Sequence, residues 1–118
     1  MIDLKPTLLS ALATLPAHIT ASFPQADLPL PVIAVSDEAG GVLAQADGLP
    51  CLDEYLIAVN IYAADAAGAE SLAGQADEAL TALGLRCRHR QDFYDEEARA
   101  YRKYLRYRAV LKQNLIYQ

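Results

Sequence analysis

The 118-residue sequence has no tryptophan, one methionine, two cysteines and two histidines. Cys51, Cys87, His18 and His89 form no CxxC, HxxxH or HExxH spacing, so neither a zinc site nor a metalloprotease helix is predicted. Cys87 and His89 stand two residues apart, which would place both on one face of a strand, and we interpret them as an ordinary buried pair. We therefore expect no metal and no cofactor.

Motifs for catalysis are also missing. No GxSxG nucleophile turn occurs, and the paired glycines lack the Lys-Ser/Thr of a phosphate-binding loop. Adjacent acids point in different directions, whereas general acid–base catalysis needs two carboxylates that converge. The chain is therefore predicted not to be an enzyme, with a small enzyme lacking recognisable motifs as an alternative. Its adjacent acids are Asp37-Glu38, Asp53-Glu54, Asp77-Glu78 and Asp95-Glu96-Glu97.

No apolar run reaches the roughly 18 residues that cross a bilayer. The apolar N-terminal stretch follows one acid and one lysine, and Pro6 and Pro16 interrupt it, so it lacks the basic start of a signal peptide. We expect no membrane segment, a cytoplasmic site of assembly and reduced cysteines. The length fits one domain over residues 1–118 with a single core.

Basic residues are scarce in the first two thirds of the chain. Residues 1–85 hold eleven acids and one base, Lys5, while residues 86–118 hold nine bases and four acids. The net charge of −5 therefore conceals an acidic body and a basic C-terminal segment. Such asymmetry can be neutralised within the chain, by a second copy or by a charged partner.

Hydrophobic periodicity predicts an α+β fold. We expect a mainly antiparallel four- to five-stranded sheet with two helices packed on one face, in the order α-β-(β)-β-α-β-β. The segment 37–41 indicates a loop or hairpin, and residues 42–50 fit either a strand or a loop. The expected elements are a helix over 4–15, strands over 32–35 and 52–63, a helix over 66–83 that ends at Gly84, and strands over 85–93 and 101–112.

The strongest feature is the alternation in the last strand, where arginines share one face and apolar residues share the other. A solvated face that prevents edge-to-edge aggregation would explain any single arginine. A cluster of cations repels itself unless acids lie opposite, so for the cluster we favour contact with the acidic body, in the same chain or in a neighbouring copy. The predicted interface comprises Arg102, Tyr104, Arg106, Arg108, Lys112, Arg88, Arg90, Asp53 and Glu54.

Three segments follow one another in a distinctive order. They are DLPLPVIAV after the N-terminal helix, DEYLIAVNIYA leading to the helix AGAESLAGQADEALTALGLR, and FYDEEARAYRKYLRYRAVL at the final strand. Together they resemble the tail terminator, or tail-completion, proteins of long-tailed bacteriophages, over nearly the whole chain. Related head–tail joining and minor tail proteins share this fold.

The resemblance implies a structural virion protein that forms a ring, commonly of six copies, at the head-proximal end of the tail tube. Such a ring stops polymerisation of the major tail tube protein and presents a surface to the head–tail connector, and DNA only passes through its lumen. The protein would be located in the virion tail. A long loop between strands contacts the tube in this family, and here it would comprise Asp37, Glu38, Gly40, Gly41 and Asp47.

The alternative function is a nucleic-acid-binding module that uses the basic, tyrosine-rich strand as a stacking platform. The net charge of −5 and the lack of a Gly-aromatic RNA-recognition signature weigh against it.

Overall fold

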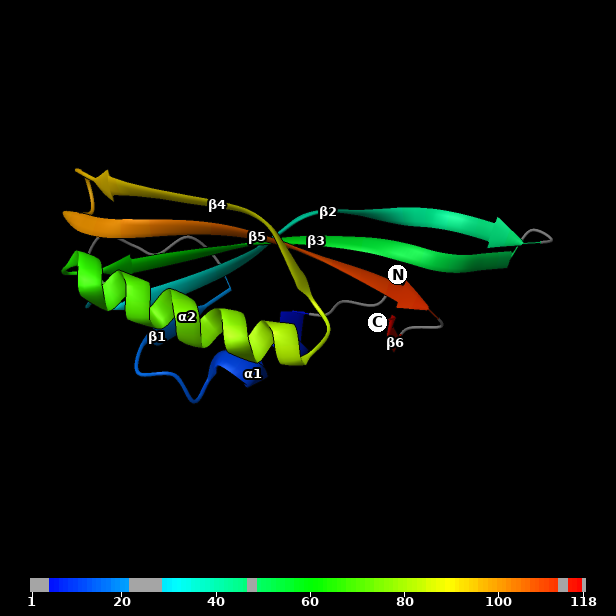
Figure 1. The fold of residues 1–118 in the computed structure, drawn as a ribbon, viewed down its shortest axis with the longest axis horizontal. Coiled ribbons are helices and arrows are strands. Elements are labelled where there is room, and N and C mark those ends of the chain that lie inside the picture. The colour runs from blue at the N-terminus through cyan, green and yellow to red at the C-terminus, as the bar shows by residue number, and fades with distance from the viewer. Residues whose placement is uncertain (1–4, 22–28, 47–48, 113–114, 118) are drawn as a thin grey trace.

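The computed structural model describes residues 5–21, 29–46, 49–112 and 115–117, with the backbone alone for 38–46, 49–53, 111–112 and 115–117. Helices and strands alternate irregularly along the chain (Figure 1). In chain order the elements are α1 (Lys5–Leu12), β1 (His18–Thr20), β2 (Val32–Ala46), β3 (Leu49–Ala63), α2 (Ala66–Ala82), β4 (Arg86–Asp95), β5 (Ala100–Lys112) and β6 (Leu115–Tyr117).

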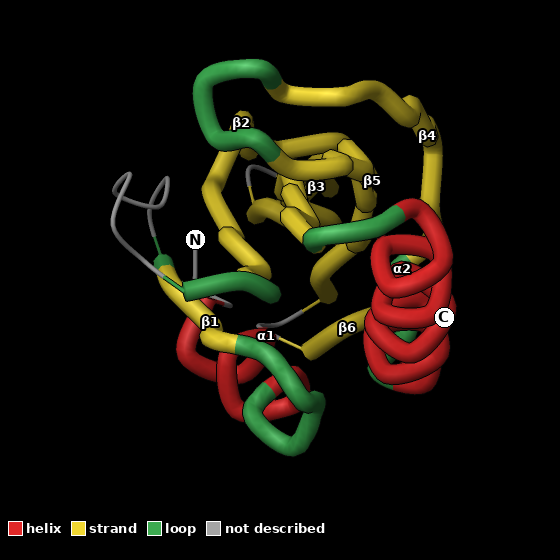
Figure 2. Tube along the Cα trace, turned by 90° about the vertical axis from the view of Figure 1, so that its left-hand side faces the viewer, coloured by secondary structure: helices red, strands yellow, loops and turns green. Residues whose placement is uncertain are grey.

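The strands form one sheet in the order β1-β2-β3-β5-β4, with β6 beside the end of β5. β1 pairs with β2 in parallel, and the other pairings among the described strands are antiparallel. Viewed along the long axis, the sheet curls, with α1 at its lower left and α2 at its lower right (Figure 2). The predicted α+β class, with a mainly antiparallel sheet and two helices on one face, is confirmed; the parallel pair makes the sheet mixed.

β1 and β6 are absent from the predicted elements. Each has three residues, too few to show an alternating pattern. β1 forms because residues 18–20 run beside residues 32–34, and the amide of His18 donates to the carbonyl of Pro31 at 2.9 Å. A pairing of this kind depends on the tertiary fold, so local sequence does not reveal it.

For residues 37–50 the structure selects the hairpin and strand alternatives, and the long loop implied by the family resemblance is wrong as to its structure. β2 continues to Ala46 and β3 begins at Leu49, so the two strands form one long hairpin. The β2–β3 pairing is interrupted by bulges at three places, where the strand backbone is irregular. The adjacent glycines Gly40 and Gly41 lie in the same stretch of β2. Four residues of the expected tube-contact loop are therefore strand residues, and Asp47 lies outside the described residues; the four are Asp37, Glu38, Gly40 and Gly41.

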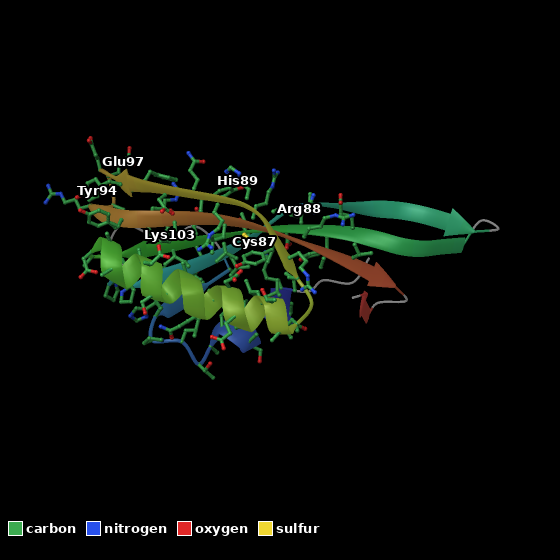
Figure 3. All side chains as sticks on the ribbon, viewed as in Figure 1. Cys87, Arg88, His89, Tyr94, Glu97 and Lys103 are labelled. Atoms are coloured by element: carbon green, nitrogen blue, oxygen red, sulfur yellow. The ribbon has the colours of Figure 1, made fainter. Side chains whose placement is uncertain are left out.

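A bulge in β4 overturns the alternation predicted for this strand. Cys87 pairs with Tyr107 and His89 pairs with Arg106, so Arg88 is the extra residue. Cys87 therefore shares the helix-covered face with Tyr107, whereas His89 points away from the helices (Figure 3). The prediction that Cys87 and His89 share a face is wrong, because one inserted residue reverses the side on which every later side chain lies.

α2 begins and ends at sites that the sequence predicts. Asp65 caps its start, where Oδ1 accepts a hydrogen bond from the Gly68 amide at 2.5 Å. Gly84 follows its end with a φ of 101°, a conformation that glycine adopts without steric cost. Neither described helix is both long and apolar enough to span a bilayer. The inward stripe of α2 consists of Ala69, Leu72, Ala73, Ala76 and Leu80.

The molecule is elongated. Its radius of gyration is 15.1 Å and it measures 52 × 24 × 21 Å, whereas a compact domain of this length has a radius of about 13.5 Å. The core lies at one end, between the helices and the sheet, and the β2–β3 hairpin projects past them (Figure 1). Pairing of β3 with β5 stops at Asp53, so the described hairpin beyond this point consists of two strands alone.

Candidate subunit interface

β5 has two distinct faces, as predicted. One face packs beneath the helices and is buried at Lys103, Leu105, Tyr107 and Ala109. The opposite face belongs to the open face of the sheet, which we define as the side away from α1 and α2. Open-face side chains of β5 are Arg102, Tyr104, Arg106, Arg108 and Val110, and those of β3 are Glu54, Leu56, Ala58, Asn60 and Tyr62.

An acid from the body lies opposite the C-terminal arginines. Arg108 Nε donates to Glu54 Oε2 at 2.6 Å, across the β3–β5 pairing. The two side chains are each about one third exposed, at 32% and 30%. The expectation that acids of the body face these cations is met within the same chain at this position. Arg108 is therefore less available to a second copy than the sequence suggested.

The Arg108–Glu54 ion pair is expected to contribute only a little to the free energy of unfolding. Because both side chains keep contact with water, we expect a coupling free energy of about 0.5–1 kcal/mol between them. Urea unfolding of Arg108→Gln, Glu54→Gln and the double variant would measure it as a double-mutant cycle. A coupling near zero would show that the short contact contributes nothing to folding.

Arg102 is held by four groups on the open face. Its Nε and Nη2 donate to Asn60 Oδ1 at 2.9 and 2.7 Å, and Nη1 lies 3.9 Å from Asp95 Oδ2. Its guanidinium stacks over the rings of Phe93 and Tyr62, at 4.7 and 5.4 Å from their centroids. This predicted interface residue is thus a structural cation that ties β3, β4 and β5 together.

The end of the open face near the β4–β5 turn holds a small second core. Val32, Tyr62 and Ala100 are buried there, at 1%, 5% and 0% exposure, although neither helix covers this side. Burial raises the pKa of Tyr62, and the positive charge of Arg102 opposes that shift. The sheet curls (Figure 2), and the Arg102 guanidinium lies over the Tyr62 ring, so this apolar end of the open face is covered.

The remaining predicted interface residues are dispersed. Arg106 is exposed on the open face between Ala58 and His89, and Tyr104 contacts the His89 ring edge-on at 6.0 Å. Arg88 is the exposed bulge residue. The other members lie elsewhere: Arg90 shares the helix-covered face with Leu105, Asp53 pairs with Leu111, and Lys112 pairs with Leu115, the last two described by backbone alone.

The expected tube-contact residue Asp37 also has partners within the chain. Its carboxylate accepts a hydrogen bond from the Tyr55 hydroxyl and lies 3.4 Å from Lys5 Nζ. It therefore helps to fasten α1 to the sheet.

A buried ion triad, which the sequence pattern does not predict, joins α2 to the edge of the sheet. Lys103 Nζ lies 2.5 Å from Glu70 Oε2 and 2.9 Å from Asp92 Oδ1. The lysine side chain is 8% exposed, whereas each carboxylate side chain keeps 68%. Burial alone would lower the pKa of Lys103, but the hydrogen bonds and charges of Glu70 and Asp92 outweigh it and raise that pKa. The ammonium therefore stays charged.

A second polar contact holds α2 to the middle of β5. The fully buried Tyr107 donates its hydroxyl hydrogen to Asp77 Oδ1 at 2.6 Å. Burial raises the pKa of Tyr107 well above its usual range, the hydrogen bond and charge of Asp77 raise it further, and Arg90 opposes the shift. The influence of Arg90 agrees with its place on the helix-covered face.

A shallow pocket of about 280 Å³ opens between the start of α2 and the β4–β5 end of the sheet. Tyr94 and Tyr101 line it with rings edge-to-face at 5.2 Å, and they are 51% and 41% exposed. Its lysine and acids are already paired with one another. Within the described part of the chain, no three His, Cys, Asp or Glu residues group so as to hold a metal ion. The exposed aromatic rings of the pocket suit an apolar contact.

No protein-family model matches this chain, and no curated protein matches it significantly.

Proposed function

We propose that this chain is a structural virion protein, a ring-forming subunit of the tail terminator kind. The ring, commonly of six copies, would cap the head-proximal end of a phage tail tube and stop its polymerisation. It would contact the major tail tube protein on one side and the head–tail connector on the other. DNA would only pass through its lumen.

The projecting β2–β3 hairpin is the observation that carries this proposal. Its two strands pair as far as Ala46 and Leu49, beyond the last β3–β5 pair. A two-stranded hairpin is at best marginally stable in water unless a further surface covers it. A hairpin of this length is therefore best explained by contact with another chain, as in a ring or on a tube.

The distribution of charge supports contact between copies. Arg106 and Arg88 are exposed on the basic segment, while the first 85 residues carry eleven acids and one base. Contact between two different patches of the same chain is a heterologous interface, and it closes into a ring when the rotation between copies allows. A self-limiting ring is what a cap on a tube requires.

The direct test measures the mass of the protein in solution and images it. Light scattering after size exclusion, at rising concentration and with added tail tubes, should reveal a closed oligomer or tubes capped at one end in electron micrographs. Capped tubes should stop growing in a length-control assay. A protein that stays monomeric and leaves tube length unchanged would rule out the proposal.

Charge reversal on the open face should weaken assembly. We expect Arg106→Glu to raise the concentration needed for half-assembly about fivefold, because it replaces attraction by repulsion at an exposed contact. Arg108→Glu should also weaken assembly, partly through loss of its Glu54 pair. Arg99→Glu in the β4–β5 turn is the matched control for net charge and should assemble as the original does. Assembly of the original protein should weaken as salt is raised.

The nucleic-acid alternative has less support. Arg102 lies beside Asp95 and Arg108 is bound to Glu54 of the same chain, and these acids reduce the charge that β5 offers to phosphates. A gel shift with single-stranded DNA and RNA at physiological salt tests it. A complex with a steep salt dependence would favour the alternative.

A further inference from the structure

β4 is an edge strand, and most of its surface is exposed. It ends the strand path β1-β2-β3-β5-β4, so one of its sides has no strand partner among the described residues. Eight of its ten residues are exposed, among them Phe93 at 37% and Tyr94 at 51%. Natural edge strands are usually shortened, bulged or blocked to prevent pairing with another chain. β4 has a bulge at Arg88, but it is regular from His89 to its end.

The charges of β4 are divided between its two halves. Its first half carries Arg86, Arg88 and Arg90, and its second half carries Asp92 and Asp95. Two antiparallel copies of such a strand place the basic half of each against the acidic half of the other. The strand is therefore complementary to itself about a two-fold axis.

Side-chain direction restricts the possible registers. Arg90, Asp92 and Tyr94 lie on the helix-covered face, whereas His89, Gln91 and Phe93 lie on the open face. Paired residues in a continuous sheet must share a face, so the axis must pass through a residue of β4 and not between two. An axis at Arg90 would oppose two arginines, and an axis at Asp92 would oppose two aspartates. An axis at Gln91 opposes two neutral amides.

We propose that two copies of this chain pair through β4, antiparallel and in the register that places Gln91 on the two-fold axis. Arg90 of each copy then faces Asp92 of the other on the helix-covered side, and His89 faces Phe93 on the open side. The Asp92 carboxylate binds Lys103 through Oδ1 and keeps 68% exposure, so its second oxygen can accept a bond from Arg90 of the other copy. The two five-stranded paths become one continuous sheet.

This β4 contact is different from the contacts between subunits of the proposed ring. Copies related by a two-fold axis face opposite ways, whereas the copies of a ring that caps one end of a tube face the same way. The β4 pair is thus a state of the protein free in solution, in which the exposed edge is covered. Cross-linking at the axis and tube capping are separate measurements, so either proposal can fail without the other.

The test is a single cysteine at the axis. Gln91→Cys is made in a background in which Cys51 and Cys87 are serine, and the purified protein is oxidised mildly. The two Gln91 positions are directly opposite, within the Cα separation of about 7 Å that a disulfide allows. We expect a species of twice the mass on a non-reducing gel, reverted to monomer by reductant.

Phe93→Cys in the same background is the register control. It lies on the same strand and face, but in this register the two copies of residue 93 are four positions apart, about 13 Å. It should therefore cross-link poorly. Adding Arg90→Glu to Gln91→Cys should lower the yield of dimer about fivefold, while adding Arg99→Glu should leave it unchanged. Equal cross-linking at positions 91 and 93, or none at 91, would overturn the proposal.

Discussion

Tyr107→Ala should remove about 3–5 kcal/mol from the free energy of unfolding, the usual cost of deleting a buried aromatic ring. The ring is fully buried and its hydroxyl binds Asp77 of α2, so its deletion leaves a cavity beneath that helix. A small domain has roughly 5–15 kcal/mol of stability in total, so this variant should be partly unfolded at 37 °C. Urea unfolding followed by circular dichroism measures the loss.

Tyr107→Phe measures the contribution of the hydroxyl to stability separately from that of the ring. Below pH 9 it should cost only about 1 kcal/mol, since it removes one hydrogen bond to Asp77 and keeps the packing. The pKa of Tyr107 is raised in the folded protein above its ordinary value of 10.0, so between these two values the folded chain holds a proton that the unfolded chain has lost. Unfolding free energy should therefore fall as pH rises above about 10.

The alkaline loss of stability should be smaller in Tyr107→Phe than in the original protein. Lys103 contributes a loss of the same sign, because its pKa is also raised from the ordinary value of 10.5. Comparing urea midpoints at pH 8 and pH 11 isolates the tyrosine. An identical pH dependence in both proteins would mean that the hydroxyl stays protonated equally well when unfolded, contrary to the burial described.

Lys103→Glu should be the second most damaging of these changes, at about 2–4 kcal/mol. It places a third carboxylate where Glu70 and Asp92 now lie within 2.9 Å of an ammonium. Removing one partner of a buried ion pair costs about 3–5 kcal/mol, but both acids here are two-thirds exposed and water lowers that figure. Urea unfolding at pH 7, followed by circular dichroism, measures the loss.

Lys103→Met is the matched control for this variant. Methionine keeps most of the apolar stem and lets the two exposed acids return to water, so we expect a loss of at most about 1 kcal/mol. A loss as large as that of Lys103→Glu would show that the ammonium itself, and not the repulsion, determines stability. Thermal unfolding of both variants at pH 7 distinguishes these outcomes.

The parts of the fold that the sequence predicts are those with local signals. From Arg102 to Val110 the alternation of β5 is strict: every second side chain is buried, and the side chains between them are half-buried or exposed. α2 has a capping acid before it and a glycine after it, and these fix both ends. β3 is apolar on both faces in its middle, which is typical of the central strand it proves to be.

The parts that the sequence misses depend on partners distant in the chain. The run from Arg86 to Arg90 alternates without a visible fault, yet the pairing with β5 inserts a bulge at Arg88. Gly40 and Gly41 are typical of a turn, but the neighbouring strand β3 holds them in a hairpin. The Arg102–Asn60 bond joins residues 42 apart, and only the register of β3 and β5 brings them together. Sequence patterns contain no information on that register.

The late position of β5 in the chain also bears on how the protein folds as it is made. β3, in the middle of the sheet, has β5 as its second neighbour, and that pairing runs up to Leu111. While a ribosome is still adding residues 83–100, the chain of the β2–β3 hairpin and of α2 has already been made, but one side of β3 lacks the strand that completes it. Pairings between such distant segments form slowly, and an uncovered central strand is prone to aggregate. The nascent chain is therefore most exposed to misassembly, and most in need of a chaperone, before Lys112 appears.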